Sequence, residues 1–246
     1  MKKLMLLFSC FSTLLISHAQ DIEAKIVYKA TLDNENYRLR ILNDSTIEED
    51  VKTWKLQDIS NKKPVNFHLL INGNQALYKS EYDMTDRMNL GWNMTSIISQ
   101  EERVYYTNSE TKEKFFKPYF AEGILVDLGD VDWTLTKESK KIGKYICYKA
   151  TANIIAEQLH DMGFIAPVVA WYTPDIPTSF GIKTFNGLPG LTLELITNLE
   201  SGKVHYIATE IDLNPKSEIK IKKPQAPKTI SEEDYLLLIK DLNNRR

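Results

Sequence analysis

The feature of this sequence that most restricts its fold is a series of short segments rich in Val, Ile, Tyr, Thr and Phe, separated by clusters of Asn, Asp, Gly and Pro. This pattern is typical of antiparallel strands joined by turns. Asn72-Gly73-Asn74 and Ser201-Gly202-Lys203 suit hairpin turns, because Asn and Gly adopt positive φ at low cost. We predict strands at Ala24–Ala30, Tyr37–Leu42, Val65–Ile71, Gln75–Tyr82, Arg103–Thr107, Glu113–Pro118, Ile124–Asp127, Asp132–Glu138, Gly143–Ala152, Ile165–Tyr172, Leu191–Asn198 and Lys203–Leu213.

The segment Lys203–Ile211 indicates how these strands assemble. Its two alternating faces both mix apolar and polar residues, which predicts a strongly curved sheet whose concave side is partly covered. A flat open sheet of a dozen strands is also unfavourable. The predicted fold class is therefore mainly β: a single curved antiparallel sheet, or half-barrel, of roughly ten to twelve strands with a C-terminal helix.

The N-terminus has the features of a secretory signal peptide. Lys2 and Lys3 precede an apolar run that ends in the small-x-small sequence Ser17-His18-Ala19, so we predict a signal peptide over 1–19 and cleavage before Gln20. The run is shorter than the roughly 20 residues that span a membrane. The alternative is a lipoprotein site at Cys10, but it leaves too short an apolar core. We expect an exported protein with no integral membrane segment in the mature chain, more in the periplasm than at the cell surface.

Three further regions complete the predicted organisation. Residues 20–213 are expected to form one antiparallel β domain, followed by a Pro- and Lys-rich linker over 214–228. An amphipathic helix is predicted over 229–246, with Ser231 and Asp234 placed as in a capping box. Asn153–Met162 fits a short helix or a hairpin arm equally.

Composition excludes several classes of protein. The 246 residues carry 31 Lys and Arg against 33 Asp and Glu, so no basic excess favours nucleic acid as a partner. Signal cleavage would leave Cys147 as the sole cysteine, which rules out an intramolecular disulfide.

Motifs for catalysis, cofactors or metals are lacking. The chain has no P-loop, dinucleotide fingerprint, zinc-protease motif or Gly-x-Ser-x-Gly elbow. Glu157 and His160 have helical ligand spacing, but two ligands make no metal site without facing helices. The Asp127–Asp132 cluster lacks the register of a calcium loop, and Cys147 has no local base to activate it. We therefore assign no catalytic residue, no metal and no cofactor.

The strongest local motif is Gly187-Leu188-Pro189-Gly190-Leu191, which predicts a type II turn with Gly190 at the position of positive φ. Together with Trp133–Thr136, Lys141–Ala150, Ala170–Pro177 and Phe185, this motif resembles the GLPGLI family of exported Bacteroidetes proteins. A weaker resemblance links the pattern to the curved half-barrels of lipoprotein carriers. The first resemblance implies secretion without an established activity; Gly187, Pro189, Gly190, Leu191 and Cys147 are interpreted as structural.

The favoured function is a non-enzymatic periplasmic or cell-envelope binding or carrier protein for an apolar ligand or peptide. Trp171, Tyr172, Phe185 and Leu188 are the candidate ligand-binding residues. One alternative is an accessory subunit of an outer-membrane transporter, recognised through an exposed sheet edge. A further alternative is an envelope peptide or glycan hydrolase that uses carboxylates such as Asp175 and Glu194 with Cys147 or His205 nearby.

Overall fold

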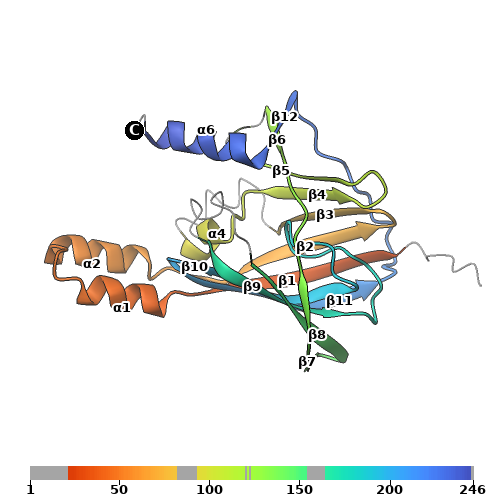
Figure 1. Cartoon of the computed structure of the whole chain (residues 1–246), viewed down its shortest axis with the longest axis horizontal. Helices are drawn as coiled ribbons and strands as arrows, with labels where there is room; N and C mark the ends of the chain where they lie inside the picture. Colours follow the sequence, from red (N-terminus) through yellow and green to blue (C-terminus); the bar gives the residue numbers. More distant parts are fainter. Residues whose placement is uncertain (1–21, 82–92, 120, 122, 154–163, 245–246) are drawn as a thin grey trace, which may run out of the picture.

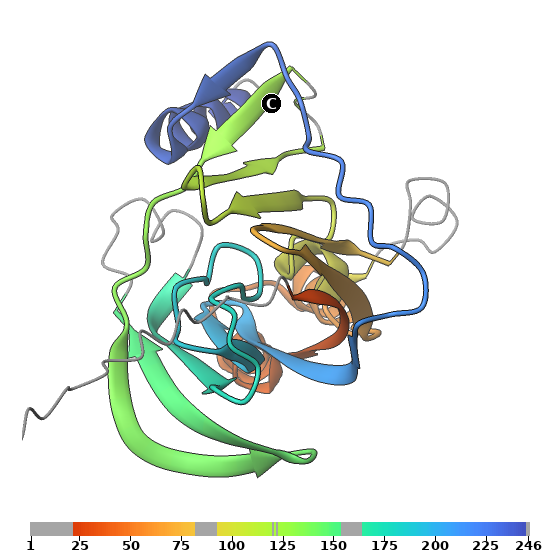
Figure 2. The same cartoon turned by 90° about the vertical axis from the view of Figure 1, so that its right-hand side faces the viewer.

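The computed structural model describes residues 22–81, 93–119, 121, 123–153 and 164–244. It contains one curved, unclosed sheet of twelve strands (Figures 1 and 2), which confirms the predicted mainly β half-barrel. The predicted signal peptide and nearly all of the Asn153–Met162 arm, including Glu157 and His160, lie outside the described residues. The strands are β1 (Glu23–Asp33), β2 (Val65–Asn72), β3 (Gln75–Ser80), β4 (Val104–Asn108), β5 (Glu113–Lys117), β6 (Ile124–Asp127), β7 (Thr134–Ile142), β8 (Tyr145–Ala152), β9 (Phe164–Thr173), β10 (Leu191–Leu199), β11 (Gly202–Leu213) and β12 (Lys228–Ile230).

The sheet consists of two meanders joined at its centre. Strands β1 to β6 are neighbours in chain order, and β7 to β11 are also neighbours in chain order. The first and last long strands, β1 and β11, are antiparallel neighbours. Ala24 lies opposite Leu213 at one end of the pair, and Asp33 lies opposite Lys203 at the other. At one end of the sheet β12 pairs with β6, in parallel rather than antiparallel orientation; β7 is the strand at the other end.

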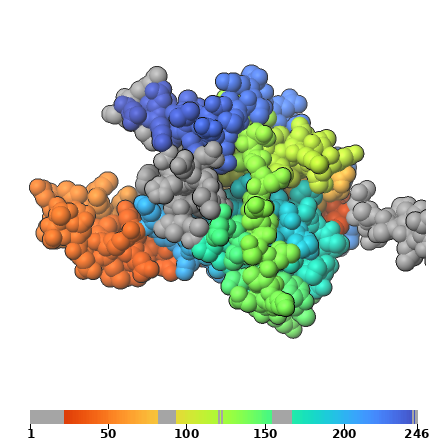
Figure 3. All heavy atoms as spheres, in the orientation of Figure 1, coloured from red at the N-terminus to blue at the C-terminus, as the bar shows by residue number. Residues whose placement is uncertain are grey.

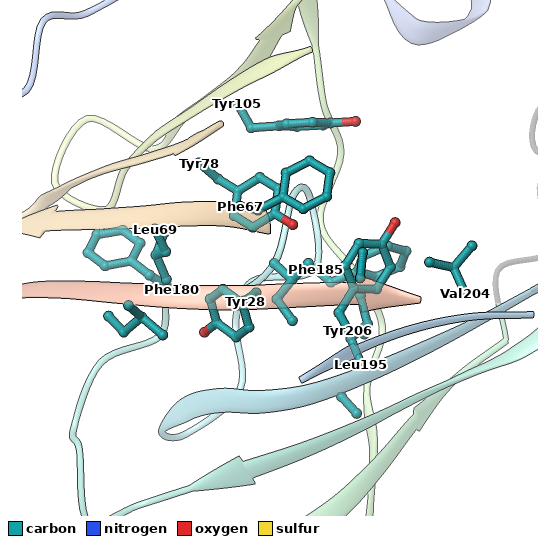
Figure 4. Packing of buried hydrophobic residues seen from close by; sticks show 14 of the residues in the cluster. Tyr28, Phe67, Leu69, Tyr78, Tyr105, Phe180, Phe185, Leu195, Val204 and Tyr206 are labelled. Carbon is teal, nitrogen blue, oxygen red and sulfur yellow. The ribbon is translucent and has the colours of Figure 1, made fainter. Parts of the chain in front are cut away.

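The concave face of this sheet carries the main hydrophobic core. Cross-strand partners share a face, and the core residues follow one another across the sheet from Tyr105 and Tyr78 to Tyr206 and Ala150. Figure 4 shows the aromatic part of this core. Phe67 stacks on Tyr78 with ring centroids 5.1 Å apart. The curvature of the sheet thus serves to surround a packed interior.

The interior is filled by the chain itself. The irregular segment 174–190 lies against the concave face and buries Ile176, Phe180, Ile182, Phe185 and Leu188. Asn186 fastens the segment: its side chain donates to Thr107 on β4 at 3.3 Å. Its backbone oxygen accepts from the Trp133 indole at 2.9 Å.

The predicted turn at the end of this segment takes a different form. Gly190 has a φ of +152° rather than the roughly +80° of a type II turn. Its N–H donates to Leu188 O, two residues back, while the Leu191 N–H donates to Ile176 O. A Cβ on Gly190 would lie 2.1 Å from Thr173 O, so close backbone packing requires this glycine. Leu188 and Leu191 are both buried beside the turn.

The linker after β11 packs on the convex face. Residues 214–227 contain no helix or strand, yet Ile219 is buried. Ile221 and Ala226 pack against a second apolar cluster on β3 to β6, formed by Leu77, Tyr106, Phe115 and Leu125. The apolar residues of these strands are therefore packed on both faces: the main core covers the concave face, and the linker covers the convex face.

The described helices are α1 (Glu35–Asn43), α2 (Glu49–Asp58), α4 (Met94–Ile98) and α6 (Glu232–Asn244). The strand predicted at Tyr37–Leu42 was wrong, because these residues belong to α1. The apolar residues of this segment alternate as they do in a strand. In the structure, however, Arg38 forms an ion pair with Glu35, one helical turn away. The segment packs against α2, and the two helices form a hairpin that projects from the sheet (Figure 1).

The C-terminal helix α6 begins at Glu232 rather than at 229. Ser231 Oγ accepts the Asp234 N–H at 3.1 Å, as expected of an N-cap. Tyr235 is 1% exposed and packs edge-to-face on Phe116, with ring centroids 5.2 Å apart. The helix therefore covers the β4–β6 end of the concave face.

Candidate functional site

The β7 end of the sheet is an exposed edge. Strand β7 pairs with β8 on one side, and within the described ranges no strand pairs with its other side. Most residues of β7 are exposed, and Figure 3 shows the β7–β8 hairpin, light green, at the molecular surface. The pairing is irregular between Leu135 and Ser139. This edge offers unpaired backbone groups to another chain.

Apolar side chains continue onto this edge from the core. Leu135 lies opposite the buried Ala150, and Ser139 lies opposite Tyr148, so these residues share the concave face. Leu135, Ile146 and Tyr148 are nevertheless 53%, 55% and 38% exposed. The apolar face of the sheet therefore extends beyond its cover.

The predicted ligand-binding residues fall into two groups. Tyr172 is on the concave face beside this open end, with its ring 6.2 Å from that of Tyr148. Trp171, the preceding residue on β9, lies on the other face and is partly exposed. Phe185 and Leu188 are 3% and 1% exposed within the covering segment. The contact of all four residues with a ligand stays a prediction.

A charged cluster occupies the opposite face of the same strands. Glu194 on β10 is nearly buried and forms an ion pair with Lys140, which extends from β7. His205 Nε2 lies 2.9 Å from Glu194 Oε1. The Lys140 ammonium also lies 4.3 Å from the centre of the Trp171 ring. Burial by itself would raise the pKa of the Glu194 carboxyl. The hydrogen bonds to His205 and Lys140 and the charge of Lys140 have a larger combined effect in the opposite direction, so the pKa of Glu194 lies below its usual value.

The proposed hydrolase residues are thus partly brought together. Glu194 and His205 line a surface depression of about 290 Å³, with Thr31 and Lys203 among its other walls. Asp175 is exposed. Cys147 itself is 0% exposed, and burial raises its pKa to about 11. A thiol in this state is a poor nucleophile.

A second polar group, which the sequence did not indicate, lies inside the core. Lys183 is 5% exposed and adopts a left-handed φ of +58°. Its ammonium lies 5.2 Å from the centre of the Tyr206 ring. Burial, with a smaller contribution from the charge of Arg103, lowers the pKa of Lys183 to about 7. The sequence shows only a lysine in an apolar loop, and lysines in loops are usually exposed.

The described residues contain neither a cluster of metal ligands nor a membrane-spanning helix. In the described ranges, no three His, Cys, Asp or Glu side chains are grouped as metal ligands would be. None of the described helices has the length and apolar character needed to span a membrane.

Comparison with known proteins shows a family resemblance over part of the chain. A family model described as a protein of unknown function, Porph_ging, matches residues 133–167 and 157–194. This region includes β7 to β9, the covering segment and the Gly187–Leu191 turn. No curated protein matches this chain.

Three of the solved structures that match this chain have TM-scores below 0.5. Two structures of PNGF-II have TM-scores of 0.49 and 0.48 at 14% and 16% identity, and cover 88% and 89% of this chain. The chain spans only 33% of the length of each PNGF-II chain. A putative outer membrane lipoprotein-sorting protein domain from Vibrio parahaemolyticus has a TM-score of 0.29 at 7% identity, covering 80% of this chain and 87% of that one. The chain is thus similar to a family of unknown function over residues 133–194.

Proposed function

We propose that this chain is an exported GLPGLI-family protein, active in the periplasm, that binds an extended polypeptide segment without chemical catalysis. The segment adds to the sheet along β7, where its backbone pairs with the free edge. The observation that carries this proposal is the combination, at one end of the sheet, of a strand with no described partner on its outer side and of exposed apolar side chains on the concave face.

The side chains around β7 support recognition of a peptide. In strand addition, backbone hydrogen bonds supply affinity, and alternate side chains of the peptide supply specificity. Here alternate side chains of a bound segment would contact Leu135, Ile146 and Tyr148, which are the exposed part of the concave face. A membrane-protein segment bound in the same way would make the protein an accessory subunit of an outer-membrane transporter.

The same edge limits which peptides bind. Lys137 and Lys141 are exposed on β7, and the irregular pairing between Leu135 and Ser139 interrupts the strand. Lysines and bulges on an edge strand disfavour unselective pairing between sheets. We therefore expect the bound segment to carry acidic residues beside its apolar ones.

The test is a screen of short unstructured peptides, followed by hydrogen exchange of the protein with the best binders. We expect binding to slow exchange of the β7 amides, and we expect Ile146→Lys to weaken binding roughly tenfold or more. Leu237→Lys is the matched control, because Leu237 is equally exposed, at 58%, on α6. Peptides that protect other strands and leave β7 unchanged would disprove the proposal, as would equal effects of the two variants.

A further inference from the structure

Lys183 is a basic side chain buried in the interior. Its side chain lies inside the core on a loop that Asn186 organises. Asn186 Oδ1 accepts the Gly181 N–H at 2.8 Å within the loop, and Asn186 Nδ2 donates to Thr107 on β4. Across the described ranges no carboxylate lies within ion-pair distance of the Lys183 ammonium, which lies 5.2 Å from the centre of the Tyr206 ring. The charges of Arg103 and Glu102 act on it from further away and with opposite sign.

Two tyrosine hydroxyls in the same region have no hydrogen-bond partner in the described part of the chain. The hydroxyls of Tyr78 and Tyr206 are fully buried and make no hydrogen bond with any described residue. The Phe67 ring contacts both tyrosine rings: its centroid lies 5.1 Å from that of Tyr78 and 6.0 Å from that of Tyr206. By contrast, the Tyr28 hydroxyl in the same core donates to Thr192 O at 2.6 Å. Among the described core tyrosines, Tyr28 and Tyr105 therefore have hydrogen-bonded hydroxyls, whereas Tyr78 and Tyr206 do not.

These groups are costly unless something binds to them. A buried polar group without a hydrogen bond costs about 1–3 kcal/mol, and an uncompensated buried charge costs more. Few buried polar groups in a native protein lack a partner, and those that do usually mark a water, an ion or a functional group that binds there. Lys183 and Tyr78 line the same narrow space, together with Tyr105 and Asn186.

We propose that this part of the interior is the binding site for the carboxylate of a small apolar acid. One ammonium supplies one positive charge, which matches a carboxylate better than a phosphate with its additional charge. The tyrosine hydroxyls are donors for the carboxylate oxygens. The neighbouring walls, Leu69 and Ala76, would contact the apolar body of the acid. This site is independent of the peptide edge at β7.

Binding requires the covering loop to move. The space between Lys183, Tyr78 and Tyr105 has no room for even a water molecule in this conformation. The loop Gly181–Asn186 is attached through the side chain of Asn186 and the Trp133 contact. Because Lys183 is itself part of this loop, we expect the loop and the ammonium to shift together as the acid enters, while the strands stay in place.

The experiment measures binding of octanoate and of octanol by calorimetry at a pH slightly below 7, in a buffer free of carboxylates. Octanol has a similar chain without the charge. We expect octanoate to bind wild-type protein at least roughly tenfold more tightly than octanol, and Lys183→Met to lose this preference. Lys216→Met, at an exposed lysine of the linker, should keep it.

A second variant keeps the test decisive if Lys183→Met fails to fold. The double change Tyr78→Phe and Tyr206→Phe retains both rings and removes only the two unpaired hydroxyls. We expect it to weaken octanoate binding several-fold and to leave octanol unaffected. The proposal is wrong if wild-type protein binds no octanoate, if octanol binds equally well, or if the double variant retains full affinity.

Discussion

Lys183 provides a strong test of the energetics of this core. An unfolded chain keeps a lysine protonated up to a pKa of about 10.5, whereas burial lowers the pKa of Lys183 in the folded protein to about 7. Between these two values the unfolded state binds the additional proton, so the free energy of unfolding rises with pH. Below about pH 7 both states hold the proton, and the full cost of the buried charge applies.

The size of the effect follows from the same two values. Each tenfold difference in proton affinity corresponds to about 1.4 kcal/mol, so burying the charged Lys183 costs about 5 kcal/mol well below pH 7 and about 4 kcal/mol at pH 7. Raising the pH from 7 to about 10 should therefore increase the free energy of unfolding by about 3 to 4 kcal/mol. Lys183→Met keeps a flexible chain of similar length without the charge, and loses at most about 1–2 kcal/mol of attraction to the Tyr206 ring.

The assay is urea unfolding of wild type, Lys183→Met and the exposed-site control Lys216→Met at a series of pH values from about 7 to 10, in a buffer without carboxylates. We expect Lys183→Met to be the most stable protein near pH 7, and its advantage over wild type to shrink toward pH 10. Comparing the variants removes the contribution of other groups that titrate in this range. The reasoning would be refuted if the difference in unfolding free energy between Lys183→Met and wild type did not change with pH. It would also be refuted if Lys183→Met were less stable than wild type near pH 7.

Three further outcomes can be checked with single variants or reagents. Gly190→Ala should destabilise the protein by about 3 kcal/mol or more, measured by urea unfolding, because the added Cβ would clash with Thr173 O. Cys147 should react with iodoacetamide near pH 8 about 100-fold more slowly in folded than in unfolded protein, since burial raises its pKa from 9 to about 11; equal rates would contradict its burial. Ser231→Ala should cost about 1 kcal/mol, because it removes the acceptor for the Asp234 N–H, and an unchanged unfolding midpoint would show that the cap is unimportant.

The strand pattern was predictable because it is local. Period-two alternation and turn residues located the strands of both meanders, and they fail at Tyr37–Leu42, where a short amphipathic helix imitates the alternation. The Ser231 cap was also local: a hydroxyl three residues before the N–H that it accepts.

The candidate sites were less predictable because they depend on tertiary packing. Glu194 and His205 were named from the sequence as neighbours, but Lys140 joins them only because β7, β8, β9 and β10 are adjacent in the sheet. Lys183 had no signal at all, since its burial depends on a loop that folds back onto β4 through Asn186. Which strand is left at the edge likewise depends on the order of the whole sheet.

The central position of the β1–β11 pair has a consequence for how the chain folds. Ala24 pairs with Leu213, so the two strands in the middle of the sheet are separated by nearly the whole chain. Such non-local pairing makes folding slow. Until β11 has emerged, β1 is itself an open edge beside its partner β2, and it is exposed to pairing with other chains. We therefore expect the N-terminal meander to be prone to pairing with other chains until β11 is available to cover β1.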